Sequence, residues 1–339
     1  MMEFLSDYGL FLAKTATLLV ALGIAIAMIA GASRRGGVTP GIQVDKLNDR
    51  FRELGRAVRR AALNKAAFRK QEKADKKARK KAEKGAGDDD HRKRFFVLDF
   101  KGDIRATAVS HLREEISAVV SVANGNDEVV LRLENAGGAV HEHGLAASQL
   151  LRLKSRKIPV TVIVDKVAAS GGYMMACIAD RVIAAPFAVI GSIGVLAQLP
   201  NFNRALKDRG VEWEEVTAGK YKRTVTMFGS NTEADREKLR EELEEVHRLF
   251  KGLVAEHRPT LNLDQVATGE HWYGTRALEL GLVDELGASD DYLLNAIEHG
   301  DVYRVRWKGK PSLQERVMHA LDAAAEAFGR ARWDGTWFR

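Results

Sequence analysis

The sequence predicts an α/β fold with a largely parallel β-sheet, joined to a membrane anchor and a basic helical stalk. From residue 95 onward, short apolar runs alternate with amphipathic runs, which is typical of βαβ units. Near the N-terminus a 19-residue stretch carries no charge, and most of the positive charge follows it. The 339 residues, 45% of them apolar, are enough for one large domain with appendages.

The N-terminal region, residues 1–34, is predicted to be an uncleaved membrane anchor. The uncharged stretch 15–33 would form a helix of about 28 Å, close to the thickness of the hydrocarbon layer of a bilayer. A cleaved signal peptide should begin with positive charge, but here Glu3 and Asp7 outnumber Lys14. A buried helix of a soluble domain is the alternative interpretation.

Residues 35–94 are predicted to form a basic helical stalk. Between residues 45 and 94 there are 19 Lys and Arg against 9 Asp and Glu, so this segment carries more than the net charge of +7 of the whole chain. The composition favours a solvated helix that ends near residue 85. Next to a membrane span, contact with anionic lipid headgroups or a soluble stalk is a better interpretation than binding of nucleic acid.

The α/β domain is predicted over residues 95–300. Strands are expected at 95–100, 128–134 and 159–164, with Asp103 capping the helix that follows the first strand. Later helices are predicted over 144–155, from Ser170 onward, over 201–209 and over 232–257. The uncharged stretch 182–200 is interrupted by Pro186, Gly191 and Gly194, so a buried strand–turn–strand is predicted there instead of a second span. Residues 301–339 are expected to add a strand and an amphipathic helix.

Ser170 is the candidate nucleophile. It follows the strand 159–164 after a short loop and begins a helix, where the helix dipole and the backbone of Gly171 and Gly172 favour an approaching carbonyl. Gly137 and Gly138 follow strand 128–134 in the same way, and their N–H groups are candidates for an oxyanion hole. Taken alone, Ser170 would be interpreted as a helix cap and the glycine pair as an ordinary turn.

Four motifs in order give the sequence a more specific meaning. They are the glycine pair after the strand, DKVAASGGY (165–173), GSIGV (191–195) and GKYK (219–222). Together with Gly281-Leu282-Val283-Asp284, this order resembles the signal peptide peptidase (SppA) family of serine–lysine peptidases. The resemblance runs from about residue 95 to about residue 287. It implies a ClpP/crotonase-like fold of stacked βαβ units.

The resemblance also implies roles for individual residues. Ser170 would be the nucleophile and Lys222, three residues after Gly219, the general base, while Ser192 would orient the lysine. The oxyanion hole would use Gly137 of the Gly137–Gly138 pair, with the Gly171 N–H as its partner. The family usually has Ser-Pro before the two glycines, where this chain has Asn135-Ala136.

A lysine base makes a strong physical demand on its surroundings. A free lysine side chain has a pKa near 10.4, so a base at neutral pH must be surrounded by apolar groups and kept away from acids. From its own segment alone, with Lys220 and Arg223 beside it, Lys222 would be interpreted as an ordinary surface cation.

Other kinds of site are also represented in the sequence. A Ser–His–Asp triad would use His141 or His143 with Asp165 or Glu142. The single cysteine, Cys177, excludes an internal disulfide and is expected to be a small buried side chain. No metal-binding spacing is present, and neither a metal nor another cofactor is expected.

With the predicted anchor, the resemblance implies a membrane-anchored serine endopeptidase that cleaves peptides with small or apolar residues near the scissile bond. Signal-peptide remnants and other membrane-derived peptides are the expected substrates, and the bacterial inner membrane is the expected location. The positive-inside rule and the usual description of the family disagree on which side carries the catalytic domain. Long members of the family contain two related repeats, whereas short members with one repeat assemble into rings. The chain contains one serine motif and one lysine motif, so the resemblance implies a homo-oligomer. A catalytically silent membrane scaffold and a crotonase-like acyl-CoA enzyme are the alternatives.

Overall fold

The computed structural model describes residues 7–17, 41–85 and 92–309, with side chains omitted for 78–85. These residues belong to two compact units, and the larger one, residues 42–307, contains all the features discussed below. Within the described ranges, no helix is long and apolar enough to span a membrane. The predicted span 15–33 lies outside the described residues except for its first three, which end a helix over 7–17. The predicted C-terminal amphipathic helix also lies outside them.

The main sheet has seven strands in the order β1-β10-β2-β3-β4-β6-β9. The registers described for β10–β2, β2–β3, β3–β4, β4–β6 and β6–β9 are all parallel, as the alternation of strands and helices predicts. The strands are β1 (Gly41–Lys46), β2 (Arg94–Lys101), β3 (Glu128–Glu134), β4 (Val160–Val164), β6 (Arg181–Ala184), β9 (Glu285–Leu286) and β10 (Asp301–Lys308).

One face of this sheet carries the main hydrophobic core. Alternate residues of β2 and β3, such as Leu98 and Leu131, pack against α4 (Val109–Val122) and α5 (Val140–Ser155). The predicted cap of α4 is wrong in detail, because Asp103 accepts hydrogen bonds from the N–H and Oγ of Thr107, before the helix begins. Asp103 therefore stabilises the turn that leads into α4.

The other face is covered by α2 (Leu47–Ala62) and α11 (Ser289–His299). Leu47 and Asn48 of α2 are buried, and the Asn48 side chain bonds the backbone of Gly300 and Val302. The start of the predicted stalk and the C-terminal strand β10 are thus parts of the α/β body. Beyond α2, α3 (Lys65–Gly85) forms a helical hairpin with it.

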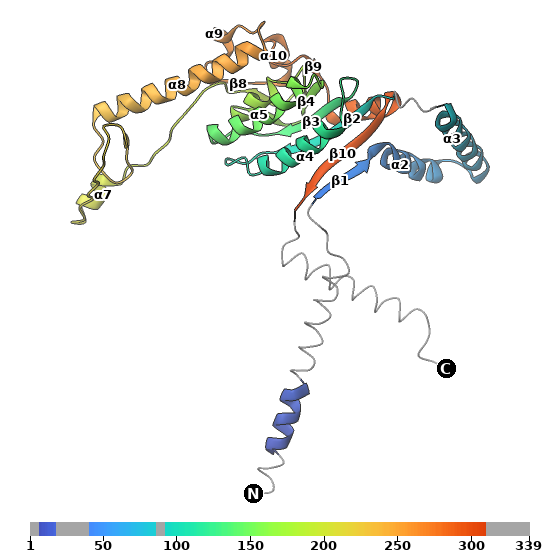
Figure 1. The fold of residues 1–339 in the computed structure, drawn as a ribbon, viewed down its shortest axis with the longest axis horizontal. Helices are drawn as coiled ribbons and strands as arrows, with labels where there is room; N and C mark the ends of the chain where they lie inside the picture. The colour runs from blue at the N-terminus through green and yellow to red at the C-terminus, as the bar shows by residue number, and fades with distance from the viewer. Residues whose placement is uncertain (1–6, 18–40, 86–91, 310–339) are drawn as a thin grey trace. The chain divides into compact units, whose positions relative to one another are not determined.

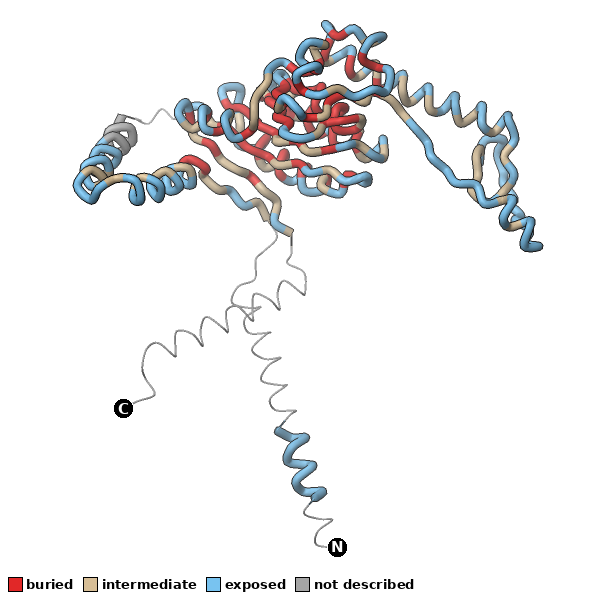
Figure 2. Tube along the Cα trace, turned by 180° about the vertical axis from the view of Figure 1, so that it is seen from behind, coloured by how far each residue is buried: buried red, intermediate tan, exposed pale blue. Residues whose placement is uncertain are grey.

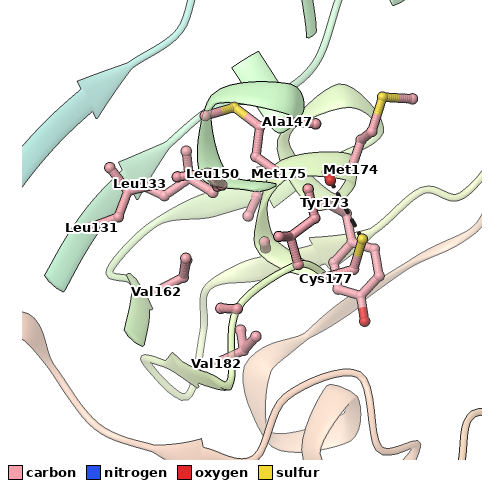
Figure 3. Packing of buried hydrophobic residues seen from close by; sticks show 14 of the residues in the cluster. Leu131, Leu133, Ala147, Leu150, Val162, Tyr173, Met174, Met175, Cys177 and Val182 are labelled. Carbon is pink, nitrogen blue, oxygen red and sulfur yellow. Dashed lines mark hydrogen bonds between the residues drawn. The ribbon is translucent and has the colours of Figure 1, made fainter. Parts of the chain in front are cut away.

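A second, three-stranded sheet lies beside the first and holds the serine motifs. Its order is β5 (Val167–Ala169), β7 (Val189–Gly191) and β8 (His271–Tyr273), with β5 and β7 parallel. The short helix α6 (Gly171–Ala176) follows β5 directly and is fully buried. Figure 3 shows Tyr173, Met175 and Cys177 of this segment among residues from β3, α5 and β4.

An arm extends from this body over residues 195–249. It contains α7 (Asn203–Lys207), which replaces the predicted helix 201–209, and most of α8 (Glu233–His257), which matches the predicted helix. Only Phe250 and Val254 of α8 are buried, and no residue of α7 is. The arm projects from the body (Figure 1) and is exposed along most of its length (Figure 2). The two short helices α9 (Leu263–Val266) and α10 (Gly274–Glu279) complete the body.

Candidate active site

Ser170 lies at the junction between β5 and α6 in a backbone conformation that non-glycine residues rarely adopt. Its φ is 52° and its ψ is −119°. The conformation is held by two backbone hydrogen bonds, from Ser170 N–H to the carbonyl of Gly191 and from Met174 N–H to the carbonyl of Ser170. Strained backbone that the surrounding structure maintains is common at catalytic residues. Ser170 is half-buried, and its hydroxyl has no hydrogen-bond partner among the described residues.

Ser192 occupies the equivalent position on the neighbouring strand. Strands β5 and β7 pair in parallel with Ala169 opposite Gly191, so Ser170 and Ser192 follow at adjacent positions. Neighbouring strands are about 4.8 Å apart, which brings the two serines to the same strand ends. Ser192 also has a positive φ of 51°, and its N–H donates to the carbonyl of Glu270. The structure thus brings together two of the serines that the sequence singled out.

The glycine pair lies directly against the nucleophile. A Cβ atom on Gly137, whose φ is 93°, would come within 2.7 Å of Cβ of Ser170 and 2.9 Å of N of Gly171. The Gly137 N–H donates to Oδ1 of Asn135 at 2.9 Å, so this donor is already used within the loop. The Gly138 N–H has no acceptor among the described residues. Of the two glycines, Gly138 therefore has the donor that remains available for an oxyanion.

A buried polar pair supports this loop, and sequence reasoning missed its role. Asn135, where the related family usually has serine, is 1% exposed and bonds through Oδ1 to both Gly137 N–H and Nε2 of His143, the latter at 3.2 Å. The other ring nitrogen of His143 lies 2.9 Å from the carbonyl oxygen of Ala139. The available signal was the replacement of the usual serine by Asn135, with a histidine eight residues later. Only the fold shows that these two side chains touch.

His143 also packs against the start of helix α6. A Cβ on Gly171 would come within 2.4 Å of the imidazole ring, so a glycine is needed there to admit it. The ring is completely buried, and both its nitrogens are bonded as described above. His143 consequently connects the glycine loop to the helix that begins after Ser170.

This arrangement argues against a histidine-based triad. His141 is exposed, with its Nε2 3.8 Å from Glu142, and His143 is enclosed behind Gly171. Asp165, the other proposed orienting acid, accepts hydrogen bonds from the N–H and Oγ of Ser289 at 2.8 and 2.6 Å. No carboxylate in the described part of the chain therefore orients His143.

Lys222 lies on the arm, away from both serines. It is exposed, and its ammonium group forms no hydrogen bond or ion pair with any described residue. Its neighbour Tyr221 lies beside α8, with Nζ of Lys238 5.0 Å from the ring centroid. The first residue of α8 that contacts the segment beside Ser192 through a hydrogen bond is His247. Its Nε2 lies 3.2 Å from the carbonyl oxygen of Ile193, the residue after Ser192. Lys238 precedes His247 by nine residues, about 13.5 Å of helix.

Cys177 and a cavity beside α11 are not part of this cluster. Cys177 is completely buried, as predicted, and burial raises the pKa of its thiol to about 12. A cavity of about 620 Å³ lies beside α11, lined by groups including Lys93, Glu128 and Tyr292 and by none of the candidate residues. Among the described residues, no group of three or more His, Cys, Asp or Glu side chains is placed to hold a metal ion.

Comparisons with known proteins place these features in context. A model described as "Peptidase family S49 N-terminal" matches residues 3–150, and one described as "Peptidase family S49" matches residues 152–302. The chain is 46% identical over 333 residues to "Probable protease SohB" of Haemophilus influenzae, covering 95% of this chain and 94% of that one. It is also 46% identical over 321 residues to "Probable protease SohB" of Buchnera aphidicola, covering 94% and 95%. Among solved structures, a ClpP1 mutant from Listeria monocytogenes superposes with a TM-score of 0.37 and 16% identity, covering 60% of this chain and 95% of that one.

Proposed function

This chain belongs to peptidase family S49, and its SohB relatives match it over nearly the whole length. From this premise we propose that it is a membrane-anchored serine endopeptidase with a Ser170–Lys222 dyad. The observation that carries the proposal is the geometry of Ser170. A strained, half-buried serine begins a helix beside a glycine loop that retains an unused N–H. Acyl transfer requires this combination of nucleophile and oxyanion donors.

The reaction begins when Oγ of Ser170 attacks the carbonyl carbon of the scissile peptide bond. Lys222 takes the hydroxyl proton, and the carbonyl oxygen becomes an oxyanion that the N–H groups of Gly138 and Gly171 stabilise. The tetrahedral intermediate collapses, the peptide C–N bond breaks, and Lys222 delivers the proton to the leaving amine. Water then attacks the acyl-enzyme with Lys222 again as base, which releases the acid product and regenerates Ser170. Ser192 orients the lysine amine.

The dyad is proposed to form between neighbouring subunits of an oligomer. In the single chain, Lys222 is on the exposed arm, whereas a lysine base needs an apolar environment. The arm also exposes apolar side chains, which is typical of a surface that another subunit covers. The most exposed of these are Val216 (92%), Leu196 (74%), Leu249 (66%) and Tyr221 (54%). Contact with the body of a second copy would bury them and bring Lys222 to that copy's Ser170 and Ser192.

Apolar side chains beside the glycine loop support the proposed substrate class. Ile104 is 76% exposed, and its carbonyl accepts the Ala139 N–H just after the glycine pair. Val140, which begins α5, is 40% exposed. An extended peptide with small or apolar residues would cover these side chains, whereas a charged peptide would leave them in unfavourable contact. Peptides derived from membrane segments fit this requirement.

Substitution of the dyad tests the proposal directly. Ser170→Ala and Lys222→Ala are each expected to lower peptide turnover by about a thousand-fold or more, because nucleophile and base act as a unit. Lys220→Ala, a neighbouring exposed lysine, is the matched control and should keep most of the activity. A Lys222→Ala enzyme that retains more than about a tenth of the wild-type rate would refute the lysine base. A fluorophosphonate probe should label Ser170 in the wild type, and unlabelled but folded protein would favour a scaffold or an acyl-CoA enzyme.

A further inference from the structure

The hairpin of α2 and α3 separates its charges in a way that the sequence alone does not show. Two carboxylates of α3 face α2 and are paired there: Glu72 lies 2.9 Å from Arg56, and Asp75 lies 3.3 Å from Arg59. Glu72 and Asp75 are the only acidic residues between positions 65 and 77, so both are engaged in these ion pairs. The remaining charges of that stretch are all positive.

These cations share one face of α3. At 3.6 residues per turn they fall within an arc of about 140°, and both carboxylates lie outside it. All six are exposed, and we call them the basic face: Lys65, Arg69, Lys70, Lys73, Lys76 and Lys77. None of the described side chains on this arc is acidic or aromatic. Over residues 65–77 the hairpin therefore presents a positive surface that no described side chain of α3 neutralises.

The chemistry of the basic face favours lipid headgroups over nucleic acid. Five of its six members are lysines, which act as mobile point charges, whereas bidentate recognition of base edges is better served by the planar arginine fork. Stacking on single-stranded nucleic acid would need aromatic side chains, which this arc does not contain. A row of lysines is well suited to the diffuse negative potential of an anionic bilayer.

The position of the hairpin in the chain favours the same partner. The predicted membrane span ends at Ser33, and residues 34–40 separate it from β1, which leads directly into α2. Seven residues reach at most about 25 Å, so an anchor that ends at Ser33 would tether β1 within that length of the bilayer. We propose that the basic face of α3 docks on anionic phospholipid headgroups of that bilayer. This inference rests on the proposed anchor but not on the proposed catalytic dyad.

The test uses the full-length protein in nanodiscs of phosphatidylcholine, with or without phosphatidylglycerol. Surface lysines are acetylated and quantified by mass spectrometry. The lysines of the basic face should react at least about fivefold more slowly in discs with phosphatidylglycerol, and salt near 1 M should abolish this protection. Lys207 on the arm is the internal control and should react equally in both discs. Protection that does not depend on phosphatidylglycerol would overturn the proposal.

A triple variant, Lys70→Glu with Lys73→Glu and Lys77→Glu, should lose the protection of Lys65 and Lys76 while keeping peptide turnover in neutral discs. Protection by added RNA or DNA in neutral discs, with none from phosphatidylglycerol, would assign the face to nucleic acid instead. Protein that is not retained in neutral discs would refute the anchor alone. In that case the wild-type protein should still bind phosphatidylglycerol vesicles and the triple variant should not. Equal binding of the two proteins would contradict the proposed role of the basic face.

Discussion

At the scale of single residues, the candidate site depends on a short chain of contacts behind the nucleophile. His143 bonds Asn135, Asn135 bonds the Gly137 N–H, and Gly137 lies against Ser170. None of these groups except Ser170 needs to react. Their contacts hold the loop that carries the unused Gly138 N–H, and the proposed oxyanion hole requires such a fixed loop.

Substitution of His143 should therefore affect the rate more than substrate binding. Loss of one oxyanion donor costs about 100- to 1000-fold in other hydrolases, and a loosened loop should cost less. We expect His143→Ala to lower kcat by about 10- to 100-fold with a small change in KM, and His143→Gln to recover part of the loss. Steady-state kinetics with a matched melting curve measures this. His141→Ala is the control, and a larger effect there than at His143 would revive the triad.

The ion pair between Arg258 and Asp284 makes a prediction about stability and pH. Burial opposes ionisation of Asp284, but hydrogen bonds from Arg258 and from the Val182 N–H outweigh it, so the pKa of this carboxyl is lowered. In the unfolded chain the pKa of this aspartate is near 3.9, so at pH values above 3.9 the ionised side chain stabilises the fold. This contribution disappears as the pH falls through the lower pKa of the folded state. The sequence motif Gly-Leu-Val-Asp thus contains a structural aspartate.

Asp284→Asn should destabilise the protein by about 1–3 kcal/mol at pH 7, because Arg258 stays buried while the carboxylate is partly exposed. Urea unfolding at neutral pH and again below about pH 3 measures this free energy. The difference between wild type and variant should shrink at the lower pH. A difference that is constant with pH would show that the charge of Asp284 contributes nothing.

At the scale of elements, the apolar runs of the sequence predicted β2, β3 and β4 nearly to the residue, because buried parallel strands are continuously apolar. The long helix α8 was predictable from its apolar stripe and its Thr232 cap. The places of β1 and β10 were not predictable, since their pairing joins residues more than 250 positions apart. The motifs point to Ser170, Ser192 and the glycines as candidates. The contact between Asn135 and His143, only eight residues apart, depends on how the glycine loop folds against α5, and their spacing does not predict it.

The arm is the element whose role is most open to experiment. If its apolar side chains are covered by another subunit, Val216→Asp should dissociate the oligomer without unfolding the body, because burial of a charge at an interface is costly. Light scattering and circular dichroism of the detergent-solubilised protein measure both properties. Leu294→Asp, at an apolar position of α11 that is 45% exposed, is the matched control. An unchanged mass for Val216→Asp would exclude this part of the arm from the interface.

At the scale of the whole molecule, the proposed dyad would make one chain catalytically incomplete, because Lys222 lies on the arm and Ser170 in the body. Co-assembly of Ser170→Ala with Lys222→Ala chains tests this. In a head-to-tail ring formed from equal amounts, about one quarter of the subunit boundaries would combine an intact serine with an intact lysine. We expect about that fraction of wild-type activity to return. If mixed oligomers are confirmed by mass spectrometry but remain inactive, the dyad lies within one chain.

The order of strands in the main sheet also affects how the protein is made. Strand β10 lies between β1 and β2, so the first strand to leave the ribosome finds its partner only when the last one appears. At 5–20 residues per second, the 262 positions between Lys46 and Lys308 take roughly 13–50 seconds to synthesise. During that time β1 and the adjacent edge of β2 stay unpaired. Premature termination before Asp301 would leave both edges permanently open, and such a chain would be a substrate for chaperones and for degradation rather than a smaller working protein.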